Sequence, residues 1–370
     1  MLRPRKPTWR ISSCSSRGAR MRALKADHAR AFRFFLMTLL LALALAGCTT
    51  QFAPPGPYNA GEGPPPELLT TATPSEGTFR ADDGLLLPWR AWLPVGEPQA
   101  VVLALHGMND YAEAFALPGT ALAAAGIAVY AYDQRGFGAA PHRGLWPGTG
   151  RLVADLRNAT ALLAARHPGL PLYLLGESMG GAVVIAATTR PGAPQVAGII
   201  LSAPAVWGYD EMGLVPRVSL WVARRLVPGM TATGSDLKIQ ATDNLPLLQA
   251  FSTDPLVIKK TRIDAVGGLV DLMDEALLAA PKLTARTLLL YGDKDQVIPA
   301  DSLDRFWTNL PAEASGRQRR LDYPDGWHWL LRDLQAARVY ADIAAWIADP
   351  DQPLPSVTDN SARERGKEAS

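Results

Sequence analysis

The sequence predicts an α/β protein with a doubly wound, mostly parallel sheet and an inserted helical cap. Short apolar runs alternate with helical patterns through most of the chain, as expected when helices cover both faces of a parallel sheet. One segment, residues 204–283, is far longer than a crossover between parallel strands requires and carries several apolar patches. The chain has 370 residues, of which 48% are hydrophobic and 19% charged, so it can bury a large core.

Five apolar runs have the length of a strand and are mostly apolar on both faces, which is typical of strands buried inside a parallel sheet. They are Val101–Leu105, Ala128–Tyr132, Leu172–Leu175, Ala197–Leu201 and Thr287–Tyr291. Helical patterns lie between or after them, at Leu117–Ala125, Gly150–Arg166, Met179–Thr189 and Leu331–Ile347. The predicted domain covers residues 77–348, with the cap at about 204–283.

Residues 1–47 have the three parts of a secretory signal. Ten Arg and Lys residues stand against one acid, the apolar run from Phe34 to Ala46 is too short to span a bilayer comfortably, and small residues follow. The ending Leu45-Ala46-Gly47-Cys48 resembles the lipobox of bacterial lipoproteins. That resemblance implies a lipid on Cys48 and a location in the bacterial cell envelope, and Thr49 favours the outer membrane. The alternative is an uncleaved anchor with a chance cysteine at its end.

The stretches that flank the predicted domain are expected to lack packed structure. Residues 48–76 are rich in proline and glycine and predict a semi-extended tether, and residues 349–370 are polar and predict a loose tail. The formal charge of +2 comes from the basic first 47 residues, so the rest of the chain is acidic and offers no footprint for nucleic acid. The only cysteines, Cys14 and Cys48, exclude a disulfide framework and a Cys-ligated zinc site.

A candidate nucleophile follows the Leu172–Leu175 strand. Gly176-Glu177-Ser178-Met179-Gly180 stands between this strand and a helical pattern, which is the setting of a nucleophile elbow. The turn is so tight that glycines are needed on both sides, and it presents the Ser178 hydroxyl at the carboxyl edge of the sheet.

A serine hydroxyl needs a base that an acid orients. Of five histidines, only His328 lies downstream of Ser178, in a loop between two tryptophans. The acid is expected at a strand end between the two, where Gly292-Asp293-Lys294-Asp295 follows Thr287–Tyr291. Asp295 is preferred and Asp293 is the alternative, because an aspartate directly after the glycine commonly caps a turn.

Two backbone N–H groups are predicted to stabilise an oxyanion. One belongs to Met179, immediately after the nucleophile, and the other to Met108, in the turn Leu105-His106-Gly107-Met108 after an earlier strand. His106 is expected to shape that turn.

Five motifs in one order resemble those of the monoacylglycerol lipase/lysophospholipase group of α/β-hydrolases. They are Leu105–Met108, Tyr132–Gly138, Gly176–Gly181, Gly292–Pro299 and Gly326–His328, and the similarity covers about residues 78–348. Glu177 is a departure, because many members have histidine there. The resemblance implies an α/β-hydrolase fold and a membrane-tethered enzyme that cleaves carboxylic esters, with monoacylglycerols or lysophospholipids as substrates.

The expected mechanism is an acyl-enzyme on Ser178, with His328 as base and Asp295 as its partner, and no metal or organic cofactor is required. Dehalogenase chemistry is not expected, because it would need a carboxylate at the elbow, where this chain has the hydroxyl of Ser178. Two alternatives remain. One is an amidase of the proline-iminopeptidase kind, in which Asp271, Asp274 and Glu275 of the cap would hold a substrate amine. The other is a non-catalytic lipid-binding envelope lipoprotein.

Overall fold

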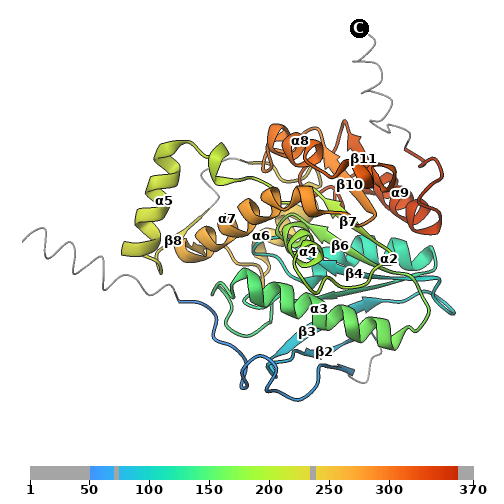
Figure 1. Ribbon diagram of the computed structural model, residues 1–370, viewed down its shortest axis with the longest axis horizontal. Helices are drawn as coiled ribbons and strands as arrows, with labels where there is room; N and C mark the ends of the chain where they lie inside the picture. The colour runs from blue at the N-terminus through green and yellow to red at the C-terminus, as the bar shows by residue number, and fades with distance from the viewer. Residues whose placement is uncertain (1–50, 71–74, 234–238, 357–370) are drawn as a thin grey trace, which may run out of the picture. The chain divides into compact units, whose positions relative to one another are not determined.

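The computed structural model describes residues 51–70, 75–233 and 239–356 (Figure 1). The expected signal peptide and Cys48 therefore lie outside the described residues. Among the helices in the described ranges, none is both long and apolar enough to cross a lipid bilayer.

A nine-stranded sheet forms the centre of the molecule, in the order β1-β2-β3-β5-β4-β6-β7-β10-β11. The six strands from β5 to β11 run parallel to one another, and β1, β2 and β3 add an antiparallel edge. The edge strands are β1 (Glu67–Thr70), β2 (Glu76–Arg80) and β3 (Leu86–Trp92). The parallel strands are β4 (Ala100–Leu105), β5 (Ile127–Tyr132), β6 (Leu172–Glu177), β7 (Gly198–Ser202), β10 (Thr287–Gly292) and β11 (Gln318–Tyr323).

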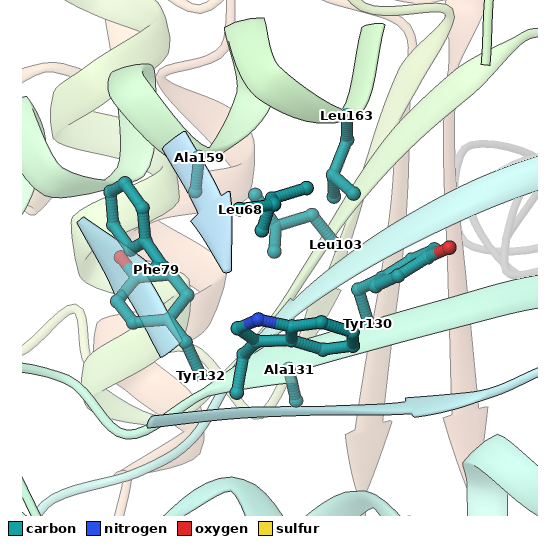
Figure 2. A pocket seen from close by; sticks show the side chains of 9 residues that line it. Leu68, Phe79, Leu103, Tyr130, Ala131, Tyr132, Ala159 and Leu163 are labelled. Carbon is teal, nitrogen blue, oxygen red and sulfur yellow. The ribbon is translucent and has the colours of Figure 1, made fainter. Parts of the chain in front are cut away.

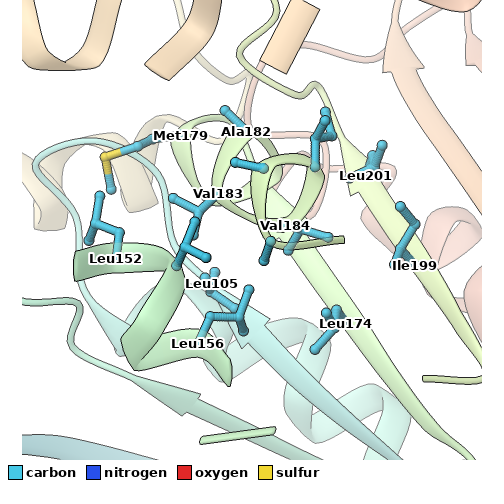
Figure 3. Close-up of a cluster of buried hydrophobic side chains, with 14 of the residues drawn as sticks. Leu105, Leu152, Leu156, Leu174, Met179, Ala182, Val183, Val184, Ile199 and Leu201 are labelled. Carbon is cyan, nitrogen blue, oxygen red and sulfur yellow. The ribbon is translucent and has the colours of Figure 1, made fainter. Parts of the chain in front are cut away.

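Alternate residues of the central strands feed two hydrophobic cores, one on each face. In β4, Val101 and Leu103 belong to one core, whereas Val102 and Ala104 belong to the other. Helices α3 (Thr149–Arg166) and α4 (Met179–Thr189) cover the first face, and their leucines and valines interdigitate with the strands (Figure 3). Helices α2 (Ala116–Ala124) and α9 (Ala336–Ala348) cover the second face.

The cap lies between β7 and β10, as the sequence predicts. It contains α5 (Leu214–Leu226), α6 (Leu245–Thr253) and α7 (Ile263–Leu278), and β8 (Thr231–Ala232) pairs with β9 (Thr261–Arg262) in a small antiparallel sheet. Helix α7 packs on α4, and α5 packs on α7 at the far side from the sheet (Figure 1). The arrangement of sheet, flanking helices and cap confirms the predicted α/β-hydrolase fold.

The five predicted strands and the predicted helix Met179–Thr189 are present. The expected helix Leu331–Ile347 is wrong at its start, because α9 begins only at Ala336. The residues before it form turns, in which the side chains of Arg332 and Asp333 are drawn into buried polar contacts.

The expectation that residues 48–76 form a tether without packed structure is corrected for the described part. The Ala53 N–H donates to the Trp146 carbonyl at 2.9 Å, the Gly56 N–H donates to the buried Asp83 carboxylate at 2.9 Å, and β1 pairs with β2. The start of the expected loose tail is also docked, since Leu354 is buried and the Ser356 N–H donates to Asp342 at 2.8 Å. Polar anchors on the domain hold both segments.

Candidate active site

Ser178 stands at the sharp turn between β6 and α4. Its φ of 53° and ψ of −116° are unusual for a residue with a side chain, and such strain is typical of functional sites. The turn is possible because glycines flank it. A Cβ on Gly176 would lie 2.5 Å from the Gly180 carbonyl oxygen, and one on Gly180 would lie 2.1 Å from that of Leu105.

Two hydrogen bonds link Ser178, His328 and Asp295. The Ser178 Oγ lies 3.0 Å from His328 Nε2, and His328 Nδ1 lies 2.8 Å from Asp295 Oδ2. Because a carboxylate only accepts, Nδ1 carries the proton and Nε2 is free to accept the Ser178 hydroxyl proton. The side chains of His328 and Asp295 are 5% and 0% exposed, so little water competes for these bonds.

The structure separates the two candidate acids. Asp295 Oδ1 accepts hydrogen bonds from the backbone N–H groups of Val297 and Ile298 at 2.7 and 3.0 Å, which leaves Oδ2 aimed at His328. Asp293 is exposed, and its backbone N–H is bonded to the Tyr323 carbonyl. The geometry therefore places Asp295, and not Asp293, beside the imidazole.

The turn after β4 passes beside the nucleophile. A Cβ built on Gly107 would lie 3.4 Å from the Ser178 Cβ, and Met108 follows directly. Met179 is the first residue of α4, so its N–H has no partner within the helix. The Ser178 N–H, in contrast, is engaged by the Ser202 carbonyl at 3.0 Å. The roles of Met108 and Met179 at an oxyanion stay predictions, but both residues lie on turns next to Ser178.

His106 stabilises the turn after β4 through buried hydrogen bonds. It is fully buried, and burial lowers its pKa, which keeps the ring neutral. Its Nδ1 donates to the Gly107 carbonyl at 2.8 Å and its Nε2 accepts from the Gln134 N–H at 3.0 Å. This is the supporting position that the sequence predicts for His106.

A buried ionic cluster next to the triad was not predicted. Arg332 donates through Nη1 to Asp110 Oδ2 at 2.7 Å and through Nη2 to Glu177 Oε1, and none of the three side chains is more than 5% exposed. Asp333 accepts from the Trp327 N–H and from the Thr242 hydroxyl, each at 2.7 Å. Arg332 and Asp333 follow His328 within five positions, and that spacing was the one available signal.

The three cap carboxylates that could hold a substrate amine instead contact other residues of this chain. Asp271 pairs with Arg224 at 2.8 Å and accepts from the Tyr209 hydroxyl. Asp274 accepts from the Tyr209 N–H at 2.8 Å, and Glu275 pairs with Arg190 at 2.6 Å. All three lie on α7, on the face of the domain that α4 covers.

Two of the hollows in the described part of the chain lie close to the sheet. An open groove lies between the turn after β4 and α6, where Leu117, Leu247 and Phe251 face Asp110 and Arg332. A second void, under β1 to β3, is lined almost wholly by apolar and aromatic groups and holds no more than about one water (Figure 2). The groove adjoins the ionic cluster, whereas the void is a packing defect of the core. Within the described ranges, His, Cys, Asp and Glu side chains do not gather in threes as metal ligands would.

Comparisons with known proteins agree with this geometry. A model of the serine aminopeptidase S33 family matches residues 96–335. The monoacylglycerol lipase of Mycolicibacterium smegmatis is 29% identical over 282 residues, which are 75% of this chain and 99% of the relative. The human monoglyceride lipase is 26% identical over 272 residues, covering 72% of this chain and 88% of the relative.

Solved structures show the same fold. A soluble variant of the Saccharomyces cerevisiae monoglyceride lipase, in complex with a substrate analogue, superposes with a TM-score of 0.64 at 20% identity, covering 81% of this chain and all of that one. The monoacylglycerol lipase of Paleococcus ferrophilus gives a TM-score of 0.59 at 24% identity, over 70% of this chain and 98% of that one. The resemblance drawn from the five sequence motifs is confirmed.

Proposed function

Because the chain belongs to the serine aminopeptidase S33 family, we propose that this serine ester hydrolase is tethered to a membrane and cleaves monoacylglycerols or lysophospholipids through an acyl-enzyme on Ser178. The observation that carries the proposal is the pair of hydrogen bonds that joins Ser178, His328 and Asp295. A lipid-binding protein without catalysis would not require all three groups in this order.

The reaction follows from the geometry in two halves. The Ser178 Oγ attacks the ester carbonyl carbon while its proton passes to His328 Nε2, and Asp295 stabilises the imidazolium. The carbon–oxygen bond to the alcohol breaks as the imidazolium returns the proton to the leaving oxygen. Water then attacks the acyl carbon while its proton passes to His328 Nε2. The carbon–oxygen bond to Ser178 breaks as the imidazolium returns that proton to the Ser178 Oγ, which releases the fatty acid. The N–H groups of Met108 and Met179 stabilise the negative oxygen in each half.

Ester substrates are favoured over aminoacyl amides. An amidase of the proline-iminopeptidase kind needs free carboxylates for the substrate amine, whereas Asp271 and Glu275 form ion pairs within this chain and Asp274 accepts a backbone N–H. The relatives described as monoacylglycerol and monoglyceride lipases support a lipid ester. Tethering through a lipid on Cys48 in the cell envelope, at the outer membrane, rests on the sequence of residues 1–49.

The test is hydrolysis by the full chain, purified in detergent, of p-nitrophenyl esters, monoacylglycerols, lysophospholipids and aminoacyl amides. We expect turnover of the esters, covalent labelling by a fluorophosphonate, and loss of both in Ser178→Ala. An unchanged rate in Ser178→Ala would overturn the mechanism, and turnover of the aminoacyl amides alone would overturn the substrate class.

A further inference from the structure

Three turns meet at the catalytic centre, and one buried arginine contacts all of them. Asp110 belongs to the turn after β4, Glu177 ends β6 immediately before Ser178, and Arg332 belongs to the His328 loop. The Arg332 guanidinium donates a hydrogen bond to each carboxylate, through Nη1 to Asp110 at 2.7 Å and through Nη2 to Glu177. Arg332 is therefore the side chain that joins the oxyanion turn, the nucleophile turn and the base.

Contacts with its own loop and with the cap also hold Arg332 in place. The Arg332 Cζ lies 4.4 Å from the centre of the Trp329 ring, and the Arg332 N–H donates to the Trp329 carbonyl at 2.7 Å. The Arg332 carbonyl accepts from the Asn244 side chain of the cap at 3.1 Å. Because Arg332 is fixed by these contacts, its hydrogen bonds to Asp110 and Glu177 fix where the two carboxylates lie relative to the His328 loop.

The charges in the cluster do not cancel. One guanidinium faces two carboxylates, and burial raises the pKa of the Glu177 carboxyl above its ordinary value while Arg332 acts in the opposite direction. Burial by itself would lower the pKa of Arg332, but Glu177 and Asp110 outweigh burial and raise it. Glu177 Oε2 has no hydrogen-bond partner among the described residues, although the side chain is 1% exposed. Such a buried carboxylate oxygen next to the nucleophile is costly unless a positive charge develops nearby.

That positive charge is the imidazolium of His328. Glu177 directly precedes Ser178, and the Ser178 Oγ lies 3.0 Å from His328 Nε2, so the backbone places the Glu177 carboxylate on the residue next to the one that contacts the imidazole. The other charged groups around the imidazole are Asp295 in direct contact, Asp110 and Arg332 in the cluster, Asp333 on its own loop, and the surface pair Lys294–Asp325.

We propose that Arg332 is a positioning residue that holds the oxyanion turn, the nucleophile turn and the His328 loop in register, and that Glu177 stabilises the imidazolium formed on His328 during the reaction. This proposal rests on the proposed function for its catalytic meaning. The sequence motifs assign no role to either residue.

The charge part is tested with Glu177→Gln, which keeps the shape and an acceptor oxygen but removes the negative charge. The imidazole becomes harder to protonate, so the acid limb of kcat/KM for a p-nitrophenyl ester moves to lower pH by about half a unit, with KM within about twofold of the parent. Asp325→Asn is the matched control. It also removes one carboxylate near the triad, three positions from His328, but that side chain is 71% exposed and screened by water, so the limb stays within about 0.1 unit.

The positioning part is tested with Arg332→Lys and Arg332→Met. Lysine keeps the charge but cannot contact both carboxylates in the fixed geometry of the guanidinium, so kcat falls about tenfold with little change in KM. Methionine leaves two buried carboxylates without a counter-charge, so kcat falls further and Tm drops, and adding Glu177→Gln to it restores part of the Tm.

A readout without substrate separates this proposal from the proposed function. The NMR titration of the His328 imidazole in the full chain is expected to move to lower pH in Glu177→Gln and to stay in place in Asp325→Asn. If no ester is hydrolysed but this shift appears, the electrostatic link stands and the hydrolase assignment fails. If the imidazole titration and kcat in Glu177→Gln and Arg332→Lys equal those of the parent, the proposal is wrong.

Discussion

At the residue scale, the acid of the triad is defined by its backbone contacts. Sequence alone leaves Asp293 and Asp295 as alternatives, since both follow a strand and a glycine. In the structure, two backbone N–H groups fix one oxygen of Asp295 and thereby direct the other to His328.

Substitution of the two aspartates should separate their roles. We expect Asp295→Asn to lower kcat by about 10³- to 10⁴-fold, because an amide at this position no longer stabilises the imidazolium or the productive tautomer. Asp293→Asn, the control in the same loop, should keep kcat within about twofold. Steady-state rates on a p-nitrophenyl ester provide the measurement, and equal losses in the two variants would contradict the assignment.

Asp333 makes stability depend on pH. Burial raises the pKa of Asp333 from 3.8 to about 6. The folded chain therefore binds more protons than the unfolded chain between these pH values, and the stabilisation present below pH 3.8 is lost as the pH rises through 6. The amount is at most about 3 kcal/mol by the size of the shift.

Asp333→Asn should remove this dependence, because the amide has no proton to lose. We expect the free energy of unfolding of the parent, relative to Asp333→Asn, to fall between pH 4 and 7 in urea titrations. The relative measure is needed because burial also raises the pKa of Glu177 and Asp155. A difference that stays constant with pH would show that Asp333 is not the titrating group.

At the scale of elements, α5 and α6 are the two α-helices in the described part of the chain in which no residue is buried, and α5 is the longer of the two. It has no buried residue, and its exposed apolar side chains include Leu214, Val218 and Trp221. Arg217 and Arg225 on the same helix add positive charge. An amphipathic helix with aromatic and basic residues is suited to the surface of a lipid bilayer.

A charge on this face should therefore affect lipid substrates selectively. We expect Trp221→Glu to lower activity on monoacylglycerol in vesicles by about tenfold while leaving turnover of a soluble short-chain ester unchanged. Val95→Glu is the control, since Val95 is also fully exposed but lies on the loop after β3 and not on the cap. Equal losses on both substrates, or an equal effect of Val95→Glu, would contradict a lipid-facing role for α5.

The elements that sequence predicts best are those with strong apolar patterns. The central strands β4 to β7 and β10 and helix α4 are predicted because their residues are buried on both faces. Strand β11 is missed because it reads Gln-Arg-Arg-Leu-Asp-Tyr, and its polar side chains are accommodated by ion pairs such as Arg320 with Asp304 and Asp322. The same limit applies at the site: Ser178 and His328 stand in motifs, whereas the contact of Arg332 with Glu177 spans 155 positions and depends on the tertiary fold.

At the scale of the whole molecule, the expected lipid on Cys48 can be tested by fractionation. We expect the parent protein to incorporate a labelled palmitate analogue and to sediment with membranes, and Cys48→Ser to lose the label and enter the soluble fraction. Cys14→Ser is the matched control, because it removes the other cysteine of the chain and should keep both properties. Labelling retained in Cys48→Ser would contradict the lipobox interpretation.

The docking of Ala53 on Trp146 limits how far such an anchored domain can travel. Only four residues lie between Cys48 and Ala53, and a fully extended chain spans at most about 18 Å over the five steps that join them. The Trp146 ring in turn contacts the backbone of the cap helix α7 at Gly268. For an enzyme lipidated at Cys48, this short connection would keep the domain close to the bilayer surface and favour capture of substrate from that leaflet over capture from bulk water.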